Sequence, residues 1–231
     1  MRTLKTLPFP LTVHCFDFNQ VQVLPSSFEP VFFVGEEFEA RSLCRHLFGR
    51  QLRCHEYALL CGCTPDFSEI AVGIDRKYLY MEFHDRELGC IGESLVYKGS
   101  DSRLILLDEH VRFLNQEKLE NRKIRWFSKQ KNACENLGIA TVQLLAAKST
   151  ISQGYCHYPR MGFQAVLPLT FRSLFGPEYS ALQTMHEILE IPEIWNLWVA
   201  QGTEVEAKFE IGTHSPSQLI FDRYWRAESG K

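Results

Sequence analysis

A strand–helix–strand pattern in the middle of this chain limits its possible folds more than any other feature. Residues 103–115 (RLILLDEHVRFLN) are typical of a long strand, and residues 140–147 (ATVQLLAA) are typical of a buried one. Between them, residues 123–138 carry apolar side chains on one face and stop at Gly138, as an amphipathic helix with a glycine C-terminal stop does. Because that helix crosses over between the two strands, we predict that they pair in parallel.

Further strands and helices are predicted on both sides of this unit. Strand-like segments at 69–75, 77–85 and 94–99 are separated by turn residues, so we expect antiparallel pairing between neighbours. Helical segments are predicted at 36–49, 55–62, 177–191 and 215–230, and a short helical or turn segment at 154–163. An aromatic segment follows at 192–202 and a strand at 203–211. Ser215 and Pro216 are typical of a helix N-terminus. The predicted fold class is α+β, a mixed and mostly antiparallel central sheet flanked by helices.

The chain of 231 residues is predicted to form a single domain, 1–231. The core is expected at 36–163, with an N-terminal extension at 1–34 and a C-terminal extension at 164–231. The N-terminal extension is rich in Phe, Pro and Val, with short strand-like stretches at 21–23 and 31–34. Its prolines are expected to keep any strand short or at a sheet edge.

Composition excludes several classes of protein. The charges nearly balance, with 25 Lys+Arg against 28 Asp+Glu and a net charge of −3, so nothing favours binding to nucleic acid or to an anionic membrane. No run approaches the roughly 20 apolar residues of a membrane helix. Pro8 and Pro10 interrupt the N-terminal stretch, which is unlike a signal peptide. We therefore expect a cytoplasmic protein with eight reduced cysteines.

The segment from Arg103 to Phe163 carries a family resemblance. Its helix ends in Leu137-Gly138-Ile139, and the segment after the second strand carries Tyr158-Pro-Arg-Met-Gly162-Phe163. In order and spacing these parts resemble the GNAT superfamily of N-acyltransferases, whose core ends in Tyr-x-x-x-Gly-Phe. The segment 154–163 (GYCHYPRMGF) is also similar to a signature of a GNAT-like branch that includes maturases acylating side-chain amines of ribosomally made peptides.

The resemblance implies an N-acyltransferase. The acyl donor would be acyl-CoA or a carrier-bound acyl-phosphopantetheine, and the acceptor a primary amine of a small molecule or a peptide side chain. Tyr158 matches the tyrosine that gives a proton to the leaving thiolate, and a phenol is protonated at pH 7. The strand is expected to pair its backbone at Val111, Arg112 and Phe113 with the pantetheine arm, as in strand addition.

The same strand offers candidate general bases. Strict alternation divides it into two faces, with Glu109, Val111 and Phe113 on one and Asp108, His110 and Arg112 on the other. Each face therefore carries a base. Glu109 is the first choice and His110 the second.

The phosphate-binding loop departs from the family pattern. The family places glycines before the central helix, where bare amides bind the pyrophosphate of coenzyme A, but residues 118–123 contain none. Asn121 can adopt a left-handed backbone, and Arg122 and Lys123 can contact phosphate. Lys123 stands where Gly or Ala is usual. The alternative is therefore a catalytically degenerate GNAT-fold binding or scaffold protein.

Pairs of cysteine and histidine residues suggest a Cys–His catalytic dyad or a metal site, but their spacing disfavours both. Cys156 and His157 are adjacent on one predicted helix, so they do not face each other as a catalytic dyad would. The Cys61-Gly-Cys63 step is tighter than that of structural zinc sites, and no second knuckle follows it, so we expect no metal.

A group of C-terminal aromatic residues has two open interpretations. These residues could wall an acyl channel or peptide groove, or pack in the core, which helical spacing favours. They are Trp195, Trp198, Phe221, Tyr224 and Trp225.

Overall fold

A seven-stranded mixed sheet organises the protein. The computed structural model describes residues 31–114, 119–147 and 154–229, so the strand-like stretch at 21–23 lies outside the described residues. The strands lie in chain order across the sheet: β1 (Val31–Phe33), β2 (Ser68–Asp75), β3 (Tyr78–Asp85), β4 (Cys90–Lys98), β5 (Leu104–Phe113), β6 (Ile139–Ala146) and β7 (Val205–Glu210). The pairs β1–β2 and β5–β6 are parallel and the others antiparallel. The predicted α+β class, the antiparallel neighbours and the parallel pair across the central helix are confirmed.

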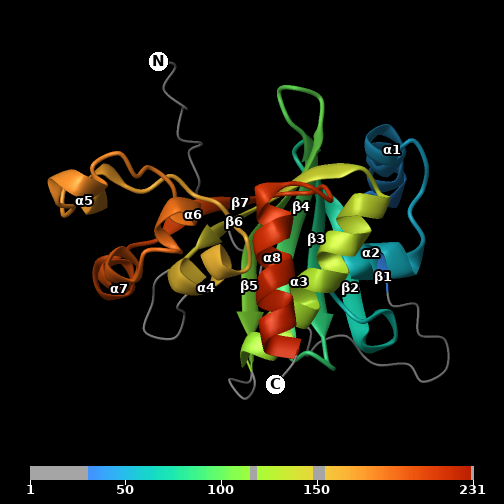
Figure 1. The fold of residues 1–231 in the computed structure, drawn as a ribbon. Coiled ribbons are helices and arrows are strands. Elements are labelled where there is room, and N and C mark those ends of the chain that lie inside the picture. The colour runs from blue at the N-terminus through green and yellow to red at the C-terminus, as the bar shows by residue number, and fades with distance from the viewer. Residues whose placement is uncertain (1–30, 115–118, 148–153, 230–231) are drawn as a thin grey trace.

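Helices flank the sheet, and the longest of them connects β5 to β6. The helices are α1 (Glu37–Phe48), α2 (Cys54–Leu60), α3 (Leu119–Asn136), α4 (Gly154–Arg160), α5 (Leu169–Arg172), α6 (Met185–Ile188), α7 (Pro192–Gln201) and α8 (Pro216–Ser229), with short 3₁₀ turns at Pro65–Phe67 and Pro177–Tyr179. In Figure 1, α2, α3 and α8 lie against one face of the sheet, and α4 to α7 gather beside β6 and β7. We call the face against which α3 packs the helix face.

The core between α3 and the sheet is strongly aromatic. Phe127 of α3 contacts Phe163, Phe209 and Phe221, with ring centroids 4.7, 4.9 and 5.4 Å away. Phe221 and Trp198 are almost fully buried. Core packing is thus the role of these two C-terminal aromatic residues.

Local end signals place several elements where the sequence predicts them. Gly138 lies directly after α3 with a positive φ of 72°, which is the left-handed region that glycine enters without strain. Ser215 Oγ accepts a hydrogen bond from the Gln218 amide at 3.1 Å, which caps α8. Gly162 has a φ of 90°, and a side chain there would overlap the Ser217 carbonyl oxygen. Glycine at 162 therefore lets the turn after α4 approach α8.

Two predicted elements are wrong in extent or kind. The helix expected at 177–191 is a 3₁₀ turn followed by the four-residue α6. Thr184 and Glu187 form a capping box that starts α6 separately from the turn before it. The strand expected at 94–99 begins earlier, at Cys90, and includes Gly92. A glycine is required at position 92 because a Cβ there would overlap the His110 carbonyl oxygen.

Candidate active site

The candidate site lies where β5 and β6 cease to pair. Their parallel pairing runs from Leu104 opposite Ile139 to Asp108 opposite Leu144, whereas β5 continues to Phe113. Beyond Asp108, none of the described strands pairs with the side of β5 that faces β6. We call this side of β5, at Val111, the open edge.

The backbone of the open edge has a defined orientation. The Leu114 amide donates a hydrogen bond to the Gly89 carbonyl at 2.7 Å, so the peptide groups of Leu114 face β4. Since peptide groups alternate along an antiparallel strand, those of Arg112 also face β4, and those of Val111 and Phe113 face the open edge. Of the three predicted backbone contacts, Val111 and Phe113 therefore direct their peptide groups away from β4, whereas Arg112 directs its groups toward β4.

A β-bulge at Glu109 changes which side chains of β5 share a face of the sheet. His110 lies opposite Glu93 and Asp108 lies opposite Ser94, which leaves Glu109 as the extra residue of the bulge. Asp108 consequently shares a face with Val111 and Phe113, and not with His110. The prediction that Asp108, His110 and Arg112 share a face is wrong, because the extra residue interrupts the alternation of side chains between the two faces.

The two preferred bases belong to the face opposite the helix face. His110 is exposed, and Glu109 is half-buried and interacts electrostatically with Glu93 and His110. Burial, followed by the charge of Glu93, raises the pKa of Glu109 above its ordinary value.

An acidic pair extends this group across the sheet. Glu82 lies directly opposite Glu93 in the β3–β4 pair. Burial and then the charge of Glu93 raise the pKa of Glu82 to about 7. This face of the sheet therefore has a local negative character near Glu109, which the near-neutral net charge of the chain does not indicate.

Asp108 is the polar residue that the structure places inside the site. It is 2% exposed and lies on the helix face. Its Oδ1 accepts hydrogen bonds from Ser94 Oγ at 2.6 Å and Gln130 Nε2 at 3.0 Å, while its buried Oδ2 has no partner among the described residues. Burial raises the pKa of Asp108 from 3.8 to about 7. Alternation offered a base on each face, and the preference for Glu109 passed over Asp108, because no sequence signal marked the bulge that brings Asp108 inward.

Tyr158 of α4 lies on the same face as Asp108. It is 8% exposed and packs edge-on against Phe163 and His157, at centroid distances of 5.4 and 6.3 Å. Burial raises the pKa of Tyr158 above its ordinary value, and the charge of Asp108 raises it further. The Tyr158 phenol therefore keeps its proton at neutral pH and can act as a donor.

The predicted phosphate-binding loop is helical. Asn121, Arg122 and Lys123 lie in the first turns of α3, which begins at Leu119, and Asn121 does not adopt a left-handed backbone. The reason is composition, because the segment from 119 lacks glycine and is made largely of good helix formers. The first-turn amides of an 18-residue helix nevertheless have no acceptor within the helix itself, and the helix dipole attracts anions to this end.

Buried cationic and imidazole groups accompany this helix start. Lys123 is 8% exposed, and burial lowers the pKa of its amine, an effect that Glu120 opposes. His157 Nδ1 lies 3.7 Å from Glu120 Oε1, while its buried Nε2 has no hydrogen-bond partner within the described ranges. Burial, then Lys123 and Arg160, lower the pKa of His157 to about 3, so the ring is neutral at pH 7.

The cysteines of the described residues are free thiols. Burial raises the pKa of Cys61, Cys63 and Cys134 well above the ordinary value, which makes these thiols poor nucleophiles. Within residues 31–114, 119–147 and 154–229, no group of three or more His, Cys, Asp or Glu side chains is placed to hold a metal ion. In the same ranges, no helix is both long and apolar enough to cross a membrane.

Fold and site together define an α+β protein in which an open strand edge, a buried tyrosine and a helix N-terminus converge on one face of the sheet. No protein-family model matches this chain, and no curated protein matches it. The function is therefore inferred from the residues and their geometry.

Proposed function

We propose that this protein is a GNAT-like N-acyltransferase that moves an acyl group from a thioester, acyl-CoA or its carrier-bound equivalent, to a primary amine. The observation that carries the proposal is the open edge of β5, where the peptide groups of Val111 face away from β4, three residues beyond Asp108, the last residue of β5 that pairs with β6. An extended amide-containing arm is the ligand that such an edge accepts.

The N-terminus of α3 is the proposed anchor for the donor phosphates. The helix dipole and the orientation of the first-turn amides favour an anion there. Lys123 is a largely buried amine for which no ion pair is found among the described residues, and an anion would offset the loss of its hydration. Arg122 adds a second cation in the same turn.

The proposed chemistry needs one acid and one base. The amine nitrogen attacks the thioester carbonyl, a C–N bond forms, the C–S bond breaks, and the thiolate takes a proton from Tyr158. The amine transfers its own proton to a base, for which Glu109 is proposed, so the amine would approach the open edge from the face of the sheet opposite Tyr158. The raised pKa of Glu109 makes its carboxylate a better proton acceptor.

A degenerate binding or scaffold protein is the second candidate. The glycine-free start of α3 and the presence of Glu120 beside Lys123 favour it, since a carboxylate in the first turn repels phosphate. Such a protein would bind the thioester without turnover, or not bind it at all.

Ligand-dependent thermal unfolding and thiol release test the proposal. Acetyl-CoA at about 100 times its dissociation constant is expected to stabilise the folded protein by about 2.7 kcal/mol, with a concentration-dependent rise in Tm. Addition of a lysine-containing peptide is then expected to release free coenzyme A. Lys123→Gln is expected to weaken binding by about tenfold through loss of a charge-assisted contact, whereas Lys208→Gln on β7 is the exposed control.

The two candidate functions give different results in this experiment. A Tm rise without thiol release for any amine supports the degenerate binding protein. Neither a Tm rise nor thiol release, with acetyl-CoA and with longer acyl-CoAs, rules out the transferase.

A further inference from the structure

The surface of β2 to β5 that lies opposite the helix face is here called the far face. In Figure 1, α2, α3 and α8 lie against the helix face, and α4 to α7 gather beside β6 and β7. The helix α1 also belongs to the helix face, since Tyr57 of α2 donates a hydrogen bond to its Cys44 at 3.3 Å, and its Arg41 lies over the Phe33 ring at 4.4 Å. Among residues 31–114, 119–147 and 154–229, no helix packs over the centre of the far face.

Two side chains at the centre of the far face are nevertheless buried. Leu95 of β4 lies between Tyr80 of β3 and Leu107 of β5, and Ala71 of β2 lies opposite Glu82 of β3. Leu95 is 3% exposed and Ala71 is 1% exposed. A sheet face that is open to water usually carries polar, exposed side chains. Burial of these two side chains therefore indicates a further layer above them.

The far face also has the composition of a surface that needs a cover. Tyr78 packs edge-on against Tyr97 with ring centroids 5.1 Å apart. Half-buried apolar and aromatic side chains surround Leu95, namely Tyr80, Ile91, Ile105 and Leu107. A contiguous apolar surface of this kind is unfavourable in water and is normally packed against another element.

A second copy of the same face is a poor candidate for this cover. Glu82 lies opposite Glu93, and Glu109 interacts electrostatically with Glu93. A two-fold interface brings the same patch of both copies together. The three carboxylates of one copy would then meet those of the other, and such like-charge contact is unfavourable.

Residues 1–30, which lie outside the described residues, have the position and length for this cover. They directly precede Val31, the first residue of β1, and β1 is the edge strand beside β2. An extended chain covers roughly 3.3 Å per residue and neighbouring strands lie roughly 4.8 Å apart. Half of this segment is therefore long enough to cross from β1 to β5.

The residue pattern of this segment also suits an apolar cover. Phe16 and Phe18 are separated by one polar residue, as are Val21 and Val23, so an extended chain presents each pair on one side. Prolines at 8, 10, 25 and 30 disfavour its incorporation into the interior of the sheet. Packing over a sheet face remains open to such a segment.

We propose that residues 1–30 pack across the far face and form a second layer on this side of the sheet, with their apolar side chains over Leu95 and Tyr80. This packing does not depend on the proposed acyl transfer. Because Glu109 belongs to the same side of the sheet, the segment would also border the proposed approach of the acceptor amine.

Hydroxyl-radical footprinting compares the full chain with a variant that lacks residues 1–30 and with the full-length double variant Phe16→Ser, Phe18→Ser. Oxidation of Tyr80 and Leu95 is expected to be about fivefold faster in the truncated protein, and faster to a smaller degree in the double variant. Met81 is the internal control, because it is fully buried on the helix face of the same strand and reacts only if the protein unfolds. Phe38→Ser, at an exposed position of α1, is expected to change nothing.

Photo-cross-linking of the full chain identifies what covers the far face. With benzoylphenylalanine in place of Phe18, cross-links are expected within one chain, to peptides from β3, β4 or β5. Cross-links between two chains would show that a second copy covers the face and would overturn the proposal. Unchanged oxidation of Tyr80 and Leu95 in the truncated protein, with Met81 protected, would also overturn it. If truncation exposes Met81 as well, the protein has unfolded, and the cross-links of the full chain decide.

Discussion

Replacement of Tyr158 with phenylalanine is expected to lower the turnover number for acyl transfer by about 100-fold or more, with the dissociation constant of acyl-CoA unchanged. The hydroxyl is the proposed proton source for the leaving thiolate, and its raised pKa keeps the proton on it at pH 7. The ring, which packs against Phe163, remains in the variant. Thiol release gives the rate, and calorimetry gives the affinity.

A second tyrosine on the same helix is the matched control. Tyr155 donates its hydroxyl hydrogen bond to the Val199 carbonyl at 2.8 Å, so Tyr155→Phe is expected to reduce stability modestly and to leave turnover intact. Full turnover in Tyr158→Phe would refute the acid role of Tyr158. Equal losses in the two variants would point to packing instead.

Replacement of Asp108 with asparagine is expected to remove a pH dependence of stability. The pKa of Asp108 is raised to about 7 in the folded protein from 3.8, mainly by burial. The folded state therefore binds the proton more tightly than the unfolded state. Its contribution to stability is complete below pH 3.8, declines as the pH rises towards 7, and is lost above that. The total loss is about 4 kcal/mol.

Urea unfolding at pH 4.5 and pH 8 measures this effect. The asparagine side chain cannot ionise, so the Asp108→Asn variant is expected to lose less stability between the two pH values and to exceed the wild type at pH 8. Asp66→Asn, at an exposed position in the 3₁₀ turn before β2, is the control for loss of one carboxyl group. Identical pH profiles for Asp108→Asn and the wild type would contradict the buried, raised-pKa carboxyl.

Signals contained in a single segment of chain predicted much of the fold. Gly138 marks the end of α3 because a glycine after an amphipathic stretch is a local C-terminal signal. The crossover from 103–115 to 140–147 predicted the parallel pair because the handedness and length of such connections leave few arrangements. Ser215 predicted the start of α8 for the same local reason.

Features that depend on pairing between distant residues were not predictable. The bulge at Glu109 arises from the register of β5 against β4, so it cannot be predicted from the residue pattern of β5 alone. Its consequence is large, because it brings Asp108 inward beside Gln130 and places His110 on the opposite face. The opposition of Glu82 and Glu93 depends in the same way on cross-strand register.

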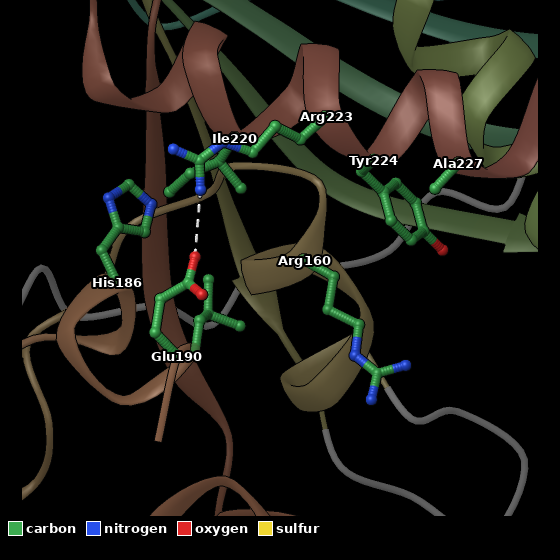
Figure 2. Close-up of a pocket in the computed structure, with 8 residues that line it drawn as sticks. Arg160, His186, Glu190, Ile220, Arg223, Tyr224 and Ala227 are labelled. Atoms are coloured by element: carbon green, nitrogen blue, oxygen red, sulfur yellow. Dashed lines mark hydrogen bonds and ion pairs between the residues drawn. The ribbon is translucent and has the colours of Figure 1, made fainter. Parts of the chain in front are cut away.

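The predicted start of the central helix was wrong, because the family pattern and the helix propensity of the residues indicate different starts. The family pattern placed a loop at 118–123, but the helix propensity of its residues extends α3 back to Leu119. The sequence also could not predict the cavity lined by residues of α4, α6 and α8 (Figure 2), because tertiary packing alone brings these segments together.

Amide hydrogen exchange at Val111 can establish whether the open edge of β5 binds an extended thioester arm. In the free protein the peptide groups of Val111 face away from β4. Saturating coenzyme A is expected to slow exchange at this amide by about tenfold or more through new backbone hydrogen bonds, with Arg112, which already faces β4, unchanged. Unchanged exchange at Val111, in a protein that calorimetry shows to be saturated, would mean that the open edge does not bind the arm.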